Sequence, residues 1–518
     1  MKAQQPGRTV AAVAGIVVAA VALGVAELVA GLWRTWRSPI LDVGDRVIDA
    51  APPFVKEFAI DTFGTNDKPA LLIGIGTLLL VYAAVIGVLA FRHRLLIGIV
   101  GIGLFAAIGM WAASTRRAGG SITAAVPSLI GGAVGIGALV LIHRALHGET
   151  GAAADGTGTA GRRDFFRHSG AVIGGFAGVA AISGAGGRLF GRRFDAESSR
   201  EDVDLPVAEE PLDALPASTE LGVDGISSFV TPNADFYRID TALTVPQVPS
   251  DSYKLSIVGM VDNEIELSYD DLTRRDLIER DITICCVSNE VGGRLIGNAR
   301  WLGVPLKELL EEAGVQSGAD QIVGRSVDGF ACGFPVENAL DGRDAMVAIG
   351  MNGAPLPLEH GFPARLIVPG LYGYVSATKW LAEIELTTFD EFDHYWLRRG
   401  WAQKAPIKTM SRIDTPRGLA KVPVGPIAIG GVAWAQTRGI ESVDVRIDDG
   451  DWQRADLGDA PTADTWRQWV YRWADAQPGR HSITVRATDG TGAIQTAERA
   501  EPIPDGASGH HQIVVIVE

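Results

Sequence analysis

The chain has few cysteines, and their placement excludes two common uses of that residue. Of its 518 residues three are cysteine, and two of these are adjacent, so a framework of disulfides cannot form. No CxxC pair occurs, which removes the usual spacing of structural zinc sites. Glycine-rich phosphate-binding motifs are missing where a nucleotide fold would need them, so the Rossmann and P-loop classes are excluded as well.

Basic charge is also scarce. The chain has 46 lysines and arginines against 61 acidic side chains, which gives a net charge of −15. Nucleic-acid-binding proteins present basic surfaces to the phosphate backbone, so this balance argues against a nucleic-acid partner. The length leaves room for two or three domains.

Long apolar runs are concentrated in the first part of the chain. Residues 10–32 are apolar except for Glu27 and are long enough to cross a bilayer. Further candidate spans lie at 69–91, 95–113, 122–142 and 169–189. Lysines and arginines in the loops place the N-terminus in the cytoplasm, although Arg116 and Arg117 then fall outside and oppose that orientation. Five spans predict a multi-pass protein of the cell membrane, with everything after residue 189 outside the cytoplasm.

The segment 162–167, which reads RRDFFR, precedes the fifth candidate span. It resembles a twin-arginine signal, which directs the export of folded proteins. The alternative is an ordinary basic stop before a helix. We favour the export signal because the span that follows is short and weakly hydrophobic.

The stretch 281–301 reads DITICCVSNEVGGRLIGNARW. Its β-branched residues lead into Cys285 and Cys286, so we expect both thiols at the end of a strand. Asn289 and Gly292 then predict a loop. Because successive strand side chains face opposite sides, only one of the two thiols can point into a pocket and reach a metal or substrate. The alternative is that both are small buried hydrophobic residues.

A series of short motifs resembles the sulfite oxidase family of molybdenum enzymes. They are VTPN at 230–233, FYR at 236–238, CVSN at 286–289, ARWLGV at 299–304, MNG at 351–353, HGFPAR at 360–365, VPG at 368–370 and KWL at 379–381. Their order and spacing agree with the family, and this agreement is far more specific than any one motif.

The resemblance implies a molybdopterin cofactor that carries molybdenum. Cys286 matches the family's molybdenum-binding thiolate, whereas Cys285 matches no ligand. His360, Arg365 and Lys379 match positions that hold the pterin and its phosphate, a role that suits fixed cationic donors. Weaker matches to cofactor-binding positions are Tyr237, Arg238, Ser376 and Thr378.

The chain departs from sulfite oxidases where those enzymes bind sulfite, a small dianion, with arginines. An R-N-H run of the family is replaced here by Ile239-Asp240-Thr241. Two further positions, after the asparagine of the cysteine loop, hold Glu290 and Val291. Each exchange of sign disfavours anion binding in a partly desolvated pocket. The alternative is that Arg238 or Arg399 compensates from a shifted position.

Two tryptophans complete the predicted substrate pocket. Trp401 stands in place of a tyrosine that the family keeps near its metal, and Trp301 matches a pocket residue that is retained. We expect Trp301, Trp401 and Glu290 to shape the choice of substrate. The resemblance therefore favours the cofactor but not sulfite as the substrate.

The C-terminal part predicts an all-β sandwich, because short β-rich segments alternate with Asp-Gly turns from residue 421 onwards. It resembles the immunoglobulin-like dimerisation domain of the same family, which implies a homodimer formed through this domain. Arg438 is the nearest candidate for the arginine that this domain contributes to the family's active site. We expect most of the domain's tryptophans to lie in its core or interface.

The predicted fold class is multi-domain. It combines a helical transmembrane region, an α+β sulfite-oxidase-type molybdopterin-binding domain and the immunoglobulin-like sandwich. The predicted ranges are four spans in 1–147, a linker with the twin-arginine-like fifth span in 148–192, an acidic linker in 193–220, the catalytic domain in 221–405 and the sandwich in 406–518.

These features predict a membrane-anchored molybdopterin-dependent oxidoreductase that acts outside the cytoplasm. It would transfer an oxygen atom to or from a small-molecule substrate and use an electron-transfer partner that the sequence does not identify. One alternative is a reductase of S-oxides or N-oxides that draws on membrane quinols. The non-enzyme alternative is a cell-surface interaction protein with a relic cofactor domain.

Overall fold

The computed structural model describes residues 5–518 except 53–54, 56–57, 59–61, 64–66, 117–118, 148–159 and 193–194. The chain divides into two compact units. The first contains Met1–Asp195 with the short segment Ala242–Val245, and the second contains Ala196–Thr241 and Pro246–Glu518.

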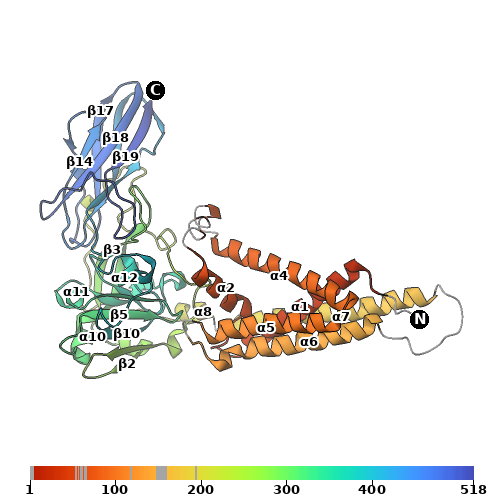
Figure 1. Cartoon of the computed structure of the whole chain (residues 1–518). Coiled ribbons are helices and arrows are strands. Elements are labelled where there is room, and N and C mark those ends of the chain that lie inside the picture. Colours follow the sequence, from red (N-terminus) through yellow and green to blue (C-terminus); the bar gives the residue numbers. More distant parts are fainter. Residues whose placement is uncertain are drawn as a thin grey trace. The chain divides into compact units, whose positions relative to one another are not determined.

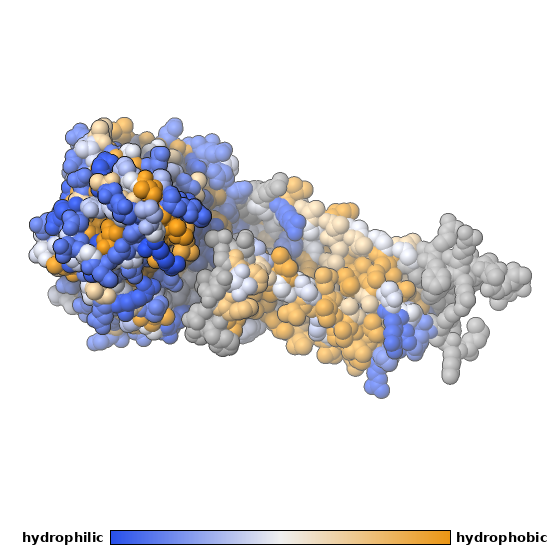
Figure 2. All heavy atoms as spheres, turned by 90° about the horizontal axis from the view of Figure 1, so that it is seen from above, coloured by the Kyte–Doolittle hydropathy of each residue, from blue (hydrophilic) through white to orange (hydrophobic). Residues whose placement is uncertain are grey.

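The first unit is built from apolar helices. They are α1 (Arg8–Ala30), α4 (Asp67–Arg92), α5 (Leu95–Ser114), α6 (Val126–His147) and α7 (Ala160–Arg192), with the shorter α2 (Pro39–Ala50) and the 3-10 turn η2 (Ile122–Ala125) between them. In Figure 1, α1, α5, α6 and α7 lie alongside one another. Hydrophobic residues cover most of the face of this unit seen in Figure 2. All five predicted spans are confirmed as helices long and apolar enough to cross a membrane.

Small residues let the helices of the first unit approach closely. A Cβ added to Gly24 of α1 would lie 2.6 Å from the carbonyl oxygen of Ala180 in α7, and one added to Gly31 would lie 2.5 Å from that of Gly187. Such close backbone contact is typical of helices that pack inside membranes. The helix α7, which contains the twin-arginine-like segment, is therefore a packed member of the bundle.

Arg116, one of the two arginines that oppose the predicted orientation, is neutralised locally. Its Nη1 lies 3.6 Å from Oδ1 of the buried Asp42, and its Nη2 donates to the carbonyl of Thr35 at 2.5 Å. An arginine held in an ion pair is weak evidence about orientation. Arg117 lies outside the described residues.

The second unit contains a mixed sheet and an antiparallel sheet around one core. The first sheet has the order β2 (Ile265–Ser268), β1 (Lys254–Gly259), β10 (Leu381–Thr387), β5 (Gln321–Ser326) and β6 (Ala331–Pro335). The second has the order β3 (Ile278–Cys285), β4 (Ile296–Pro305), β7 (Met346–Met351) and β8 (Ala354–Pro355), with β9 (Arg365–Ile367) also on β7. The helices α9 (Tyr269–Thr273), α10 (Leu306–Ala313), α11 (Glu337–Leu340) and α12 (Gly373–Ser376) connect the strands.

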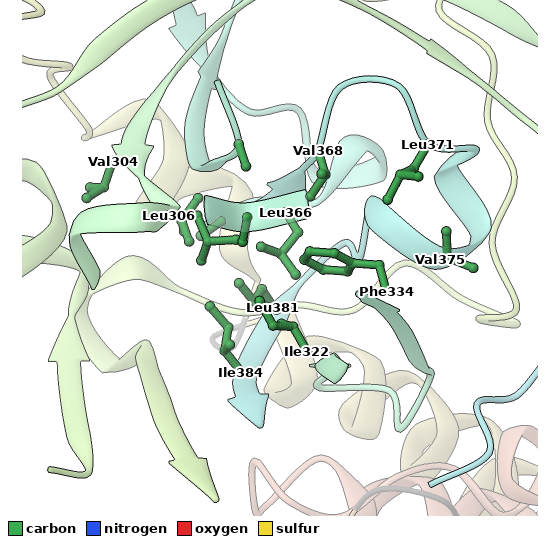
Figure 3. Packing of buried hydrophobic residues seen from close by; sticks show 14 of the residues in the cluster. Val304, Leu306, Ile322, Phe334, Leu366, Val368, Leu371, Val375, Leu381 and Ile384 are labelled. Carbon is green, nitrogen blue, oxygen red and sulfur yellow. The ribbon is translucent and has the colours of Figure 1, made fainter. Parts of the chain in front are cut away.

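The core between these elements is apolar and tightly closed. Leu366 of β9 and Leu381 of β10 meet Ile322 of β5 and Phe334 of β6, and none of the four side chains is exposed (Figure 3). Burial of this kind stabilises a domain by roughly 1.5–3 kcal/mol for each large apolar side chain. The α+β character of this part is as predicted.

The segment predicted as an acidic linker, 193–220, joins the second unit from Ala196 onwards. It forms the short helix α8 (Ala196–Glu201) and the turn η3 (Ala217–Thr219). Glu210 bridges to Ile278 at the edge of β3, and its carboxylate is 2.5 Å from the Arg280 guanidinium. The segment is therefore packed against the second unit and is more than a linker.

The C-terminal part of the second unit is β-rich. One sheet has the order β11 (Met410–Thr415), β13 (Gly425–Trp434), β17 (Arg467–Ala476) and β16 (Asp456–Leu457). The other has the order β12 (Lys421–Val422), β19 (His511–Val517), β18 (Gly479–Asp489), β14 (Ile440–Ile447) and β15 (Gln453–Arg454). Both sheets contribute to one core, which contains Ile429, Trp469, Val443 and Val485. The immunoglobulin-like type of this sandwich stays a prediction.

Candidate functional site

The two adjacent cysteines stand where β3 ends. Cys285 is the last strand residue and pairs with Ile296 at the start of β4. Two hydrogen bonds close the loop that joins β3 to β4. The Cys286 amide donates to the Leu295 carbonyl at 2.9 Å, and the Asn289 side chain accepts from the Leu295 amide at 2.8 Å. The prediction of thiols at a strand end, followed by a loop, is confirmed.

The structure separates the two thiols. Cys286 lines a cavity, whereas Cys285 packs in the main hydrophobic core and its thiol donates to the Cys286 carbonyl at 3.4 Å. Burial raises the pKa of the Cys286 thiol, which favours its protonated form. A metal ion bound there would hold the thiolate.

The cavity encloses about 880 Å³ of space free of protein atoms, part of it open to solvent. Six of the predicted site residues line it: Tyr237, Cys286, His360, Arg365, Lys379 and Trp401. They come from segments far apart in the sequence, so the fold brings together most of the predicted site.

Arg365 is a buried cation without a carboxylate partner among the described residues. Arg365 is the first residue of β9. Its guanidinium donates to the carbonyl of His360 at 3.1 Å and to that of Ala377 at 3.4 Å. Its Nε is buried and has no hydrogen-bond partner. Burial lowers the pKa of Arg365 to about 10, which still leaves it charged at neutral pH. An unpaired buried cation in a cavity wall calls for an anionic ligand.

Lys379 and His360 line the same cavity as Arg365 but differ from each other in charge at neutral pH. The Lys379 ammonium lies 3.0 Å from Asp240 and donates to the Glu359 carbonyl at 3.1 Å, and burial lowers its pKa to about 8. The His360 Nε2 donates to the Asn233 carbonyl at 3.1 Å. Burial lowers the pKa of His360 to about 4, so the ring is neutral at pH 7.

The remaining predicted site residues do not line the cavity. Trp301 is fully buried behind it, where its indole donates to the Ile282 carbonyl at 3.0 Å and its ring faces the Arg365 guanidinium at 5.1 Å. Ser376 and Thr378 are buried and bond within the protein. Arg238 is exposed and pairs with Asp240, and Glu290 is exposed on the cysteine loop. Their roles stay predictions.

Several cavity residues were not singled out as site residues from the sequence. Asp328, Phe330, Tyr374 and Trp396 line the wall together with Asp240. Only Asp240 had given a signal, as a departure from the family's arginine run. The others lie in segments where no motif marks them.

The C-terminal strands reach the cysteine loop through Arg412, not Arg438. Arg412 in β11 donates to the Gly293 carbonyl at 2.9 Å and is paired with Asp414 at 2.6 Å. Arg438 instead pairs with Asp489 at 2.9 Å and is absent from the described cavity wall. The sequence offered no pattern that distinguishes the two arginines.

Comparison with known proteins agrees with this geometry. Residues 242–396 match the family model described as "Oxidoreductase molybdopterin binding domain". The mitochondrial sulfite oxidase of Rattus norvegicus is 28% identical over 336 residues, which are 56% of this chain and 60% of the rat protein. The uncharacterized oxidoreductase YuiH of Bacillus subtilis is 32% identical over 149 residues, which are 29% of this chain and 72% of that protein. The chain belongs to the sulfite oxidase family of molybdopterin-dependent oxidoreductases.

The fold is also similar to that of a solved structure. The sulfane dehydrogenase SoxCD from Paracoccus pantotrophus superimposes with a TM-score of 0.50 at 24% identity, over 57% of this chain and 84% of that chain. This family member spans less than two thirds of the length of the rat and human sulfite oxidases. The predicted family and its cofactor, molybdopterin with molybdenum, are confirmed.

The cavity of this family member suits that cofactor. A thiol on one wall supplies the soft donor that molybdenum prefers, and the unpaired guanidinium of Arg365 supplies a charge for the pterin phosphate.

Proposed function

We propose that this protein is a membrane-anchored molybdopterin-dependent oxidoreductase that transfers an oxygen atom between water and a small-molecule substrate. The observation that carries the proposal is the convergence of the Cys286 thiol and the unneutralised Arg365 on one cavity. Membership of the molybdopterin-dependent family supplies the rest of the assignment.

Each residue of the site has a separate task. Cys286 would bind molybdenum, and Arg365 with Lys379 would hold the pterin phosphate. His360 is a neutral ring whose Nε2–H is held by the Asn233 carbonyl, so its other ring nitrogen can accept a hydrogen bond from the pterin without adding charge. Tyr237 lines the cavity with its ring stacked on Phe236 at 5.4 Å, and burial keeps its hydroxyl protonated as a hydrogen-bond donor by raising its pKa. When bound, the molybdenum supplies two-electron oxygen-atom chemistry that the protein lacks.

The membrane part of the proposal rests on the five apolar helices. The protein would be a multi-pass protein of the cell membrane with its N-terminus in the cytoplasm and its catalytic part outside. The twin-arginine-like segment 162–167 supports export of a folded, cofactor-loaded domain. A homodimer would form through the C-terminal sheets, and electrons would pass to or from a separate electron-transfer partner.

The proposal is tested by the molybdenum content and turnover of the purified full chain and of Cys286→Ser. The host must make the cofactor. We expect close to one molybdenum per chain in the wild type, and loss of turnover in Cys286→Ser whether or not the pterin keeps the metal. Wild-type chain without molybdenum from such a host would overturn the proposal.

A second candidate function is the reduction of S-oxides or N-oxides with electrons from membrane quinols. It is favoured by the charge of the cavity, where the arginine run of sulfite oxidases is replaced by residues that include Asp240, whose side chain is only 3% exposed. Reoxidation of the dithionite-reduced enzyme by an organic oxide, followed by visible absorption, distinguishes it from sulfite oxidation.

A further inference from the structure

The first unit also contains a cavity. It holds about 500 Å³ of space free of protein atoms, part of it open, and residues of α1, α2, α4, α5 and α6 line it. Among the described lining residues, Ser128 of α6 is the one polar side chain and none is charged. A wall without charge disfavours ionic ligands such as the phosphodiester head of a phospholipid.

The hydroxyl of Ser128 has no hydrogen-bond partner among the described residues. The residue is 6% exposed, and its Oγ is buried. A serine inside a helix usually bonds back to the carbonyl one turn before it, and Ser128 does not. Because a buried hydroxyl without a partner is costly, nearly all such groups in proteins have one. The unpaired hydroxyl in the cavity wall therefore points to a ligand that brings an oxygen atom to it.

Gly109 of α5 leaves space beside this hydroxyl. A Cβ added to Gly109 would lie 2.6 Å from the Ser128 Oγ, and both residues line the cavity. Any other residue at position 109 would therefore cover the hydroxyl. Gly103 on the same helix has open space around its Cβ position. The need for a glycine is thus specific to the position beside Ser128.

The cavity lies toward one end of the helical bundle. Residues 22–26 of α1 and 102–109 of α5 come from the middle and second half of those helices, and residues 75–79 of α4 and 128–132 of α6 come from the first half. At the same end, a Cβ on Gly31 after α1 would meet Gly187 near the end of α7, from which the chain continues into the second unit. In the proposed topology this end is extracytoplasmic.

The charged residues of α2 are paired within the protein. Ile40 of this helix lines the cavity, which places part of the apolar face of α2 on it. The Asp42 carboxylate lies 3.6 Å from the Arg116 Nη1. The Asp45 carboxylate lies 2.9 Å from the Arg37 Nη1. Both arginines are thus already neutralised, which again disfavours a phosphate head group as the ligand.

From these observations we infer that the cavity of the first unit binds the head group of a membrane quinone, with the Ser128 hydroxyl as its hydrogen-bond partner. A hydroxyl both donates and accepts, so it suits the carbonyl of a quinone and the phenolic hydroxyl of a quinol. An uncharged ring also suits a wall without charge. The chain belongs to a family of oxidoreductases, and quinones are electron carriers that dissolve in a bilayer. The inference rests on the membrane anchoring in the proposed function and adds a site in the other unit.

The experiment is photo-crosslinking of the full-length holoenzyme in phosphatidylcholine nanodiscs. The probe is an azido-1,4-benzoquinone with a decyl tail, and mass spectrometry identifies the labelled peptides. We expect the label in the peptides of α5 and α6 that contain Gly109 and Ser128. Decyl-1,4-benzoquinone without the azide should compete with the probe. Decylbenzene, which has the ring and the tail but no oxygen, should not compete.

Two variants with matched controls test the hydroxyl and the space beside it. Ser128→Ala should weaken competition by decyl-1,4-benzoquinone roughly tenfold, because one hydrogen bond is lost. Without quinone this variant should not unfold at a lower temperature than the wild type, since it removes an unpaired buried hydroxyl. Ser114→Ala, whose exposed hydroxyl donates to the Trp111 carbonyl, is its control. Gly109→Ala should abolish the labelling, and Gly103→Ala should leave it unchanged.

The outcomes separate the inference from the proposed function. Label spread evenly over the helices, or unchanged competition in Ser128→Ala, overturns the inference, and the hydroxyl then meets only water. Competition by decylbenzene also overturns it, because the cavity then takes any apolar chain. The molybdenum content is measured on the same preparation. A molybdenum-loaded chain without specific label overturns only the inference, whereas a specifically labelled chain without molybdenum supports it and means that the proposed function fails.

Discussion

Arg365 shows how a single buried charge can be costly in one state and necessary in another. It is 5% exposed, has no carboxylate partner among the described residues and leaves its Nε unbonded. Without a ligand this charge destabilises the fold, and with a phosphate beside it the same charge binds the cofactor. The charge of Lys379, at the same cavity, is less costly without a ligand because Asp240 already pairs with it.

The substitution Arg365→Met should therefore act in opposite directions on the two forms of the protein. In protein made without the cofactor, it should stabilise the second unit by about 1–4 kcal/mol, because an apolar chain replaces an unpaired charge. In a host that makes the cofactor, it should lower the molybdenum content sharply. Denaturant unfolding and metal analysis measure the two effects.

Arg274→Met is the control, since Arg274 is exposed and pairs only loosely with Asp270 at 3.5 Å. It should change neither quantity. Full molybdenum content in Arg365→Met would show that this charge does not hold the cofactor.

Lys379 gives the site a defined pH dependence. Burial lowers its pKa from 10.5 to about 8, so in the empty protein it is charged below pH 8 and loses its charge as pH rises through that value. Binding a phosphate needs the charged form, so above pH 8 each binding event must take up a proton. The affinity for molybdopterin should then fall by up to about tenfold per pH unit.

The measurement is cofactor uptake by the empty protein between pH 7 and about 9.5, the range that brackets the shifted pKa. Lys379→Arg should abolish the slope, because a guanidinium stays charged throughout this range. An unchanged slope in Lys379→Arg would assign the titration to another group.

At the scale of elements, the loop between β3 and β4 connects the cysteine to the C-terminal strands. Gly292 in this loop has a φ of +82°, and a Cβ at this position would lie 2.3 Å from the His511 Nε2 in β19. Arg412 in β11 binds the next carbonyl of the loop, that of Gly293. The C-terminal strands thus fix the loop that positions Cys286.

Gly292→Ala should disturb this connection by backbone strain and by collision with His511. We expect a lower thermal midpoint and a molybdenum centre that is lost more easily on dilution. The control is Gly353→Ala, since Gly353 has a similar φ of +77° but open space around its Cβ position. If both variants behave alike, strain alone explains the effect and the contact with His511 has no role.

The strand end and the position of the two thiols could be predicted from the sequence. The residues of the cavity wall could be predicted only in part, for a physical reason. Alternation along the strand showed that only one thiol could face a pocket, and β3 indeed ends at Cys285. Alternation does not say which side is the core, so the choice of Cys286 came from the family resemblance. Trp396 and Phe330 were not predicted, because their place in the cavity wall depends on tertiary contacts between segments that carry no motif.

Glu290 and Asp240 show the same limit for charge. Both were recognised as acidic replacements near the expected substrate site. The turn that follows Asn289 leaves Glu290 exposed, whereas Asp240 is buried against Lys379. The sequence gives the sign of each charge, but the direction in which the charged side chain points depends on the local backbone.

At the scale of the whole molecule, the orientation of the second unit relative to the membrane is the main structural prediction. Arg94 lies between α4 and α5, and Asp270 lies on α9 of the second unit, and both are exposed. The native cysteines are all buried, so an introduced cysteine can be labelled selectively. In intact cells, a membrane-impermeant maleimide should label Asp270→Cys but not Arg94→Cys.

Cells opened by detergent should label both positions. Labelling of Arg94→Cys alone in intact cells would reverse the orientation and place catalysis in the cytoplasm. The assignment of the cofactor to the cavity would not be affected by that result.

The central claim is that Cys286 binds molybdenum in the cavity of the second unit. Molybdenum K-edge X-ray absorption of the wild type and of Cys286→Ser tests it most directly, because the spectrum reports the sulfur ligands of the metal. The account predicts that the variant has one sulfur ligand fewer than the wild type, with the pterin sulfurs unchanged. An identical number of sulfur ligands in the two proteins would contradict it.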